Sequence, residues 1–138
     1  MQEPEPTSVR HLSRAESLDL LQHRASIGRL AFIAGGHPMI LPVNYAADKD
    51  TIVFCTKPGT KLSAGGASAE VVFEVDTNSP EYRSGWSVIV RGTAREITDA
   101  RKLDGLRWGA LRSWAVRSTE HWVEISIDEI SGRIIHGE

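Results

Sequence analysis

A short segment with the sequence TKPGTK, at residues 56–61, concentrates groups that can bind an anion. It offers two threonine hydroxyls, two lysine ammonium groups and, after the Pro58-Gly59 turn, free backbone N–H groups where a helix would begin. Such groups suit a phosphate when they converge on one point. The order Gly-Thr-Lys reverses the Gly-Lys-Ser/Thr end of a nucleotide P-loop, which disfavours a Walker-type NTPase. The competing interpretation is a plain turn, with Thr60 capping a helix and both lysines in solvent.

The pattern of apolar and turn-forming residues predicts the elements that position this segment. Ser13 and Glu16 form a capping-box pair ahead of the helical spacing of Leu18, Leu20 and Leu21. Residues 28–34, 39–45 and 51–56 are expected to form an antiparallel meander. Helices are expected over 13–25, 61–64 and 98–114, and further strands over 71–75, 86–97, 122–127 and 132–135.

The chain has 138 residues, of which 41% are apolar, and this fits one domain with a core of its own. Residues 1–12 are acidic and proline-bearing and predict a flexible N-terminal arm before a single domain at 13–138. Many short strands with few helices favour a mainly β fold, a closed or split antiparallel β-barrel with accessory helices. Because its own side chains fill so small a barrel, a large ligand must lie outside it or between two copies.

Composition argues against several other classes of function. The formal net charge of −2, with both signs mixed along the chain, gives no basic face for nucleic acid. Cys55 is the one cysteine, which excludes an intrachain disulfide and favours the cytoplasm. No apolar run reaches the roughly eighteen residues of a membrane helix, and the N-terminus has no apolar signal region. The histidines lack metal-ligand spacing, so no metal site is expected.

The candidate catalytic side chains have plainer structural explanations. Cys55 lies in an apolar strand without an adjacent base and is expected to be a small buried hydrophobe. Glu74 and Asp76, two residues apart, are expected on the solvated side of a half-buried sheet and not as an acid–base pair. Trp86 or Trp114 could stack on a planar ligand, although most aromatic residues of small β domains belong to cores or interfaces. No catalytic residue is therefore assigned.

Five blocks of sequence occur in a meaningful order along residues 12–135. They are MILPVNY, TIVFCTKPGTKL, VVFEVD, GWSVIVRGTAREI and HWVEISIDEISGRII. In that order they resemble the pyridoxamine 5′-phosphate oxidase-like family of FMN-binding split barrels. The chain resembles the short bacterial members, including those linked to nitroimidazole resistance, more than the true pyridoxamine phosphate oxidases.

The resemblance implies an FMN-dependent oxidoreductase, a reductase or oxidase of a small planar substrate. It also implies a homodimer with FMN in the clefts between the subunits. The positions that match the family's cofactor-binding pattern are Pro42, Val43, Asn44, Phe54, Cys55, Thr56, Thr60, Lys61, Leu62, Trp86, Ser87 and Trp114.

Cys55 departs from the family pattern, because many relatives have arginine at this position. A guanidinium clamps a phosphate through two hydrogen bonds, which a thiol cannot do. We therefore expect weaker FMN binding, a changed phosphate geometry, or another cofactor such as a deazaflavin coenzyme. The alternative function is a non-catalytic split-barrel module that binds a flavin, a deazaflavin or haem, and a third is the handling of pyridoxal phosphate.

Overall fold

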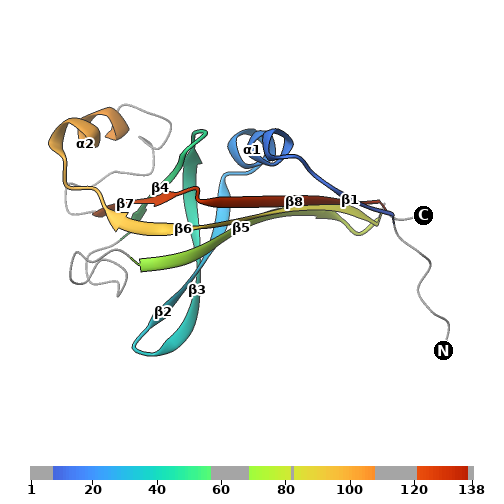
Figure 1. Ribbon diagram of the computed structural model, residues 1–138, viewed down its shortest axis with the longest axis horizontal. Helices are drawn as coiled ribbons and strands as arrows, with labels where there is room; N and C mark the ends of the chain where they lie inside the picture. The colour runs from blue at the N-terminus through green and yellow to red at the C-terminus, as the bar shows by residue number, and fades with distance from the viewer. Residues whose placement is uncertain (1–7, 57–68, 82, 108–120, 137–138) are drawn as a thin grey trace.

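A computed structural model of the chain describes residues 8–56, 69–81, 83–107 and 121–136 (Figure 1). Strands make up most of the described residues, and two helices accompany them. In chain order the elements are β1 (Ser8–His11), α1 (Arg14–His23), β2 (Ile27–Ala34), β3 (His37–Ala47), β4 (Thr51–Thr56), β5 (Ala69–Ser79), β6 (Ser84–Glu96), α2 (Ala100–Arg107), β7 (His121–Ser126) and β8 (Glu129–His136).

Six antiparallel strands close into a barrel. Neighbouring strands pair in the order β6, β5, β2, β3, β4 and β7, and β7 returns to β6. The first part of β6, residues 85–91, pairs instead with β8, which in turn pairs with β1. Residues 94–96 of β6 then pair with β7. β6 therefore belongs both to the barrel and to a two-strand extension, and the predicted mainly β split barrel is confirmed.

Alternating side chains build the barrel interior. In β5, Val71, Phe73 and Val75 are buried, while Glu74 and Asp76 point outward. The same period of two holds in β2 and β6, so apolar residues from facing strands meet inside the barrel. The side chains fully buried there include Leu30, Ile52, Phe54, Phe73, Val75, Val88, Val90, Val123 and Ile125.

The two helices cover different parts of the sheet. α1 lies against β8, β6 and β3, and its Leu21 is buried in the barrel core. α2 carries Leu103, which packs outside the barrel on a second apolar cluster of Val53, Ile97 and Trp122. In Figure 1, α2 lies at the end of the long strands where β6 meets β7, and α1 lies over their middle. The other side of β1, β8, β6, β5, β2 and β3, which faces away from the barrel interior and from α1, carries neither helix; we call it the outer sheet face.

Gly92 lies where β6 changes partner from β8 to β7. A Cβ atom at this position would stand 1.7 Å from the carbonyl oxygen of Ser126. The backbones of β6 and β7 thus approach so closely that only glycine fits, and this approach helps to close the barrel.

The helix predicted to begin at Ser13 is observed, with a complete capping box in which Ser13 and Glu16 exchange hydrogen bonds. It ends at His23, two residues earlier than predicted. The second helix begins at Ala100, and its predicted end lies outside the described residues, as does the short helix predicted at 61–64. None of the described helices has the length and apolar character needed to cross a membrane.

One sequence prediction needs correction at the N-terminus. Residues 8–11, expected to be part of a flexible arm, form β1 and pair with β8, where Val9 lies opposite Ile135. The four residues are all exposed, so they lack the buried alternation that identifies a strand from sequence. Their strand form depends on the edge of β8, which lies at the other end of the chain.

Candidate functional site

Asn44 and Cys55 lie opposite one another on the outside of the barrel. Tyr45 pairs with Phe54 and points inward, so the preceding Asn44 and the following Cys55 share the outward side. Ile27 pairs with Asn44 on one flank, and Trp122 pairs with Cys55 on the other. The result is an outward row of side chains beside Thr56, the last residue of β4, after which the chain enters the TKPGTK segment.

The strand pleat separates the residues predicted to bind the cofactor. Val43 and Phe54 point into the barrel core, which leaves only their backbone groups for an outside ligand. Pro42 is exposed and lies opposite Arg29 on the outer sheet face. Thr56 pairs with His121. The predicted residues Thr60, Lys61, Leu62 and Trp114 lie outside the described residues.

Trp86 and Ser87 are neighbours in β6 and face opposite ways. Trp86 packs against the core cluster, on the side that α1 covers. Ser87 belongs to the outer sheet face and pairs with Asp76 of β5 and Arg133 of β8. Of the two, only Ser87 can present its side chain to a ligand on that face.

Cys55 is half-buried and packs against the apolar cluster beneath α2. That cluster consists of Val53, Ile97 and Trp122, which suits the predicted role of a small apolar side chain. It lies at the border between this cluster and the outer sheet face. A thiol here can contact a ligand but cannot clamp a phosphate as arginine would.

Arg29, Glu74 and Asp76 form a charged cluster in the middle of the outer sheet face. One guanidinium nitrogen of Arg29 lies 3.0 Å from Glu74 Oε1 and 3.1 Å from Asp76 Oδ2. Burial raises the pKa of Glu74, the hydrogen bond and charge of Asp76 raise it further, and Arg29 acts in the opposite direction. The outward side predicted for the two acids is confirmed, but they are paired with a cation and half-buried instead of freely solvated.

Sequence reasoning missed this cluster because Arg29 is 45 residues away from Glu74 in the chain. Alternation in β2 places Arg29 outward, next to the buried Gly28 and Leu30. This alternation is the sequence signal that places Arg29 on the outward side of β2. The pairing of β2 with β5, which brings Arg29 opposite Glu74, cannot be read from local sequence.

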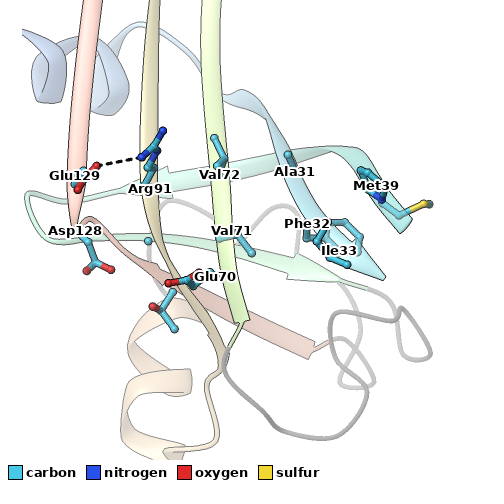
Figure 2. Close-up of a pocket in the computed structure, with 13 residues that line it drawn as sticks. Ala31, Phe32, Ile33, Met39, Glu70, Val71, Val72, Arg91, Asp128 and Glu129 are labelled. Atoms are coloured by element: carbon cyan, nitrogen blue, oxygen red, sulfur yellow. Dashed lines mark ion pairs between the residues drawn. The ribbon is translucent and has the colours of Figure 1, made fainter. Parts of the chain in front are cut away.

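A groove of about 600 Å³ crosses the outer sheet face beside the β2–β3 hairpin (Figure 2). Its apolar wall comes from the hairpin and includes Phe32, Ile33 and Met39. The opposite wall is charged and includes Arg91 and Glu129, whose side chains lie 3.7 Å apart. This volume falls within the range of small-molecule and peptide-binding clefts.

A third group of charges lies at the other end of the barrel, near α2. Lys102 forms an ion pair with Glu124, and His121 contacts Glu96 through its Nδ1 atom. His121 and Glu124 therefore have different partners on opposite sides of β7, as their three-residue separation predicts. Among the residues the structure describes, no three potential ligand side chains converge on a metal position.

Comparison with known proteins gives consistent matches over nearly the whole chain. The Mycobacterium tuberculosis protein Rv0080 is 26% identical over 132 residues, which is 91% of this chain and 81% of that protein. The structure of the FAD-binding protein from Mycobacterium smegmatis is 32% identical, with a TM-score of 0.69, and the match covers 92% of this chain and 98% of the other.

A FAD-binding protein from Mesorhizobium loti superposes with a TM-score of 0.77 at 28% identity, covering 94% of this chain and 98% of that one. Residues 13–134 match the sequence pattern of the family described as pyridoxamine 5′-phosphate oxidase. That match includes every strand of the barrel and both helices. The chain therefore belongs to the pyridoxamine 5′-phosphate oxidase family.

Proposed function

We propose that this protein is a flavin-dependent oxidoreductase that acts on a small planar substrate as a homodimer. One observation carries the proposal: β4 ends at Thr56 beside the outward Asn44 and Cys55, where the TKPGTK segment begins. The segment with phosphate-binding groups thus directly follows the outward side of a barrel whose family and similar structures include flavin-binding proteins. A cytoplasmic location is part of the proposal, because the chain's single cysteine forms no disulfide within it.

The residues of this chain would bind and orient the flavin. Thr60 and Lys61, with the backbone N–H groups after Gly59, would hold its phosphate. Asn44 and Ser87 would meet polar edges of the ring system, and Pro42 offers it a flat apolar contact. The bound flavin itself supplies the electron or hydride transfer. Val43 and Phe54, packed in the core, keep the supporting strands rigid.

The proposal also concerns which flavin the protein binds. FMN is the cofactor implied by the sequence resemblance, whereas two of the similar structures are FAD-binding proteins. Both flavins carry the ribityl phosphate that the TKPGTK segment would bind. Cys55 in place of arginine removes one clamp on that phosphate, so we expect this protein to bind FMN less tightly than relatives with arginine.

The homodimer is supported by the distribution of exposed apolar side chains. Among the described residues, the large exposed hydrophobic side chains are Val9, Ile27, Ile33, Met39, Ile40, Val72 and Ile89. All except Met39, near the hairpin tip, lie on the outer sheet face by strand register. An apolar face of this kind marks an interaction surface, and a second copy would cover it.

The first test is the visible absorption spectrum of the purified protein, followed by release and mass identification of any chromophore. A flavin spectrum with FMN or FAD in the released fraction would support the proposal and name the cofactor. A deazaflavin or haem spectrum would keep the fold but change the chemistry. A colourless protein that takes up neither FMN nor FAD would contradict it.

Substitutions test the phosphate segment directly. Lys61→Ala removes a charge-assisted contact worth about 1.5–3 kcal/mol, which corresponds to a loss of about 10- to 150-fold in flavin affinity. Lys49→Ala, at the exposed β3–β4 turn, is the matched control and should leave affinity unchanged. Cys55→Arg should tighten binding. Equal affinity of the wild type and Lys61→Ala would contradict the role of this segment.

A non-catalytic flavin-binding module is the second candidate, and Cys55 is the observation that favours it. The two candidates differ in turnover. Oxidation of a nicotinamide donor with a quinone or nitroaromatic acceptor, by protein that retains its flavin, would support the enzyme. A flavin that is held but not reduced under the same conditions would support the module.

A further inference from the structure

We propose that two copies of this chain, when they pair through the outer sheet face, take up one proton from solvent at each Arg29–Glu74–Asp76 cluster. The proposal rests on the homodimer of the proposed function and adds a regulation of it by pH. It makes the cluster a proton-linked element of the dimer interface.

The cluster is central to the surface that pairing would cover. Glu74 lies opposite Arg29 on β2 and opposite Ile89 on β6, and Arg29 lies opposite Pro42 on β3. Exposed apolar side chains surround these positions, with Ile27, Ile40, Val72 and Ile89 among them. Covering those residues with a second copy therefore also removes water from the cluster.

Shape and charge favour a second copy as the partner. The β2–β3 hairpin projects from the barrel, and the groove of about 600 Å³ runs beside it (Figures 1 and 2). A two-fold axis would let each hairpin meet the groove of the other copy. The groove wall carries Glu70, Asp128 and Glu129 against Arg91, whereas the tip of the hairpin, from Ala34 to Met39, has His37 and no carboxylate. The acidic groove wall would therefore meet no carboxylate on the hairpin tip of the second copy.

The charges of the cluster do not balance. Arg29 contributes one positive charge, and Glu74 and Asp76 contribute two negative charges, so the ionised cluster carries −1. Water screens that charge while the face is exposed, since the side chain of Arg29 is 52% accessible. Burial of an uncompensated charge in an interface is costly, and a proton on one carboxyl makes the cluster neutral.

Glu74 is the group that takes the proton. It is already half-buried beside Asp76, and two carboxyl groups that share one site cannot both stay ionised at low cost. Protonated Glu74 can donate a hydrogen bond to Asp76, which stays ionised against Arg29. The step forms one O–H bond on the Glu74 carboxyl group, with a proton taken from the solvent.

Other charged groups on the same face must be separated from this effect. They come from every neighbouring strand: Arg29 of β2, Glu70 and Asp76 of β5, Arg91 of β6, Glu129 and Arg133 of β8, and His11 of β1. Arg91 and Glu129 form a pair of zero net charge, so their burial needs no proton. His11 and His37 are the same in the wild type and in Glu74→Gln, so the comparison of these two proteins isolates the cluster.

The test is the dimer dissociation constant of the flavin-loaded protein, measured by mass photometry between about pH 5 and pH 8. With one proton taken up per subunit, the wild-type dissociation constant should fall by up to about 100-fold per pH unit as pH falls. Glu74→Gln mimics the protonated state. This variant should dimerise at least about tenfold more tightly at pH 8 and lose most of the pH dependence.

Glu129→Gln is the matched control, because it removes one carboxylate from the same face without changing the cluster. It should keep the wild-type pH dependence. If dissociation is too weak to measure, subunit exchange between tagged and untagged copies gives the same comparison through its rate.

Three results would overturn the proposal. A dimer with the same pH dependence in the wild type and in Glu74→Gln would show that the cluster takes up no proton, while the homodimer would stand. Weaker dimerisation of Glu74→Gln would mean that a partner arginine neutralises the cluster. A chain that stays monomeric at every pH and with flavin bound would remove both this inference and the homodimer.

Discussion

The hydroxyl group of Tyr45 donates a hydrogen bond to the carbonyl oxygen of Leu21, with 2.6 Å between the two oxygens. Leu21 lies in the last turn of α1, where carbonyl groups have no partner within the helix. The Tyr45 ring also packs edge-on against Phe73, with 4.9 Å between the ring centres. One side chain of the barrel core therefore holds the end of α1 in place.

Loss of this hydrogen bond should destabilise the protein. Tyr45→Phe keeps the ring packing but leaves the carbonyl oxygen of Leu21 buried without its donor. We expect the free energy of unfolding to fall by about 1–2 kcal/mol. Urea denaturation followed by tryptophan fluorescence measures the change, and an unchanged midpoint would mean that water replaces the hydroxyl.

The same residue makes the fold sensitive to alkali. Burial raises the pKa of Tyr45 well above its usual value. In the unfolded chain the Tyr45 phenol loses its proton at about pH 10, whereas in the folded protein the phenol stays protonated. The free energy of unfolding therefore falls as the pH rises past about 10. Urea midpoints of Tyr45→Phe should decline less steeply above that pH than those of the wild type. Parallel curves would refute this.

Gly92 should tolerate no side chain. A methyl group would meet the backbone oxygen of Ser126 at 1.7 Å, and neither strand can move without opening the barrel. Gly92→Ala should cost about 3 kcal/mol or more, or prevent folding. Gly36→Ala is the control: its φ is +80° but nothing lies within 4 Å, so it should cost only about 1–2 kcal/mol. Similar losses in both variants would argue against the close approach of β6 and β7.

Asp48 should contribute to the loss of stability in acid. Burial would raise the pKa of Asp48, but hydrogen bonds from the Asp50 and Thr51 backbones and the Thr51 hydroxyl outweigh it and lower the pKa below its usual value. The stabilisation is therefore present above about pH 4 and is lost as pH falls through the lowered pKa. Asp48→Ala should cost about 0.5–1 kcal/mol at neutral pH and less at pH 3. A deficit that is equal at both pH values would contradict this.

The opposite directions of Trp86 and Ser87 predict different effects on flavin binding. Ser87→Ala removes a polar group from the outer sheet face and should weaken flavin binding about fivefold. Trp86→Phe leaves that face unchanged and should affect stability instead. Flavin titrations and urea curves on both variants separate the two effects. The reverse outcome would place the flavin on the α1 side of β6.

Local sequence was sufficient for the fold class and for most of the described elements. The capping box of Ser13 and Glu16, the meander of β2, β3 and β4, and the alternation in β5 each follow from neighbouring residues. Barrel closure follows from the same pattern, because a small mainly β chain must satisfy its strand edges.

Features that join distant parts of the chain could not be predicted in this way. β1 has no apolar alternation and is a strand only because β8 offers it an edge. The family resemblance places Pro42, Val43 and Asn44 together at the cofactor, yet the pleat sends Val43 inward and its neighbours outward. The contacts of Arg29 with Glu74 and Asp76 depend on the register of β2 against β5. Sequence patterns give the face of a strand, but only the folded sheet gives its partners.

The change of partner along β6 has a consequence for how this protein comes apart. β6 is hydrogen-bonded to β5 over nearly its whole length on one side, and to β8 and then β7 on the other. Separation of β7 from β6 would open the barrel, and separation of β8 from β6 would detach the extension. Either event exposes backbone amides of β6. Hydrogen exchange should therefore be slowest in the middle of β6, and the whole domain should melt as one cooperative unit with no stable half left behind.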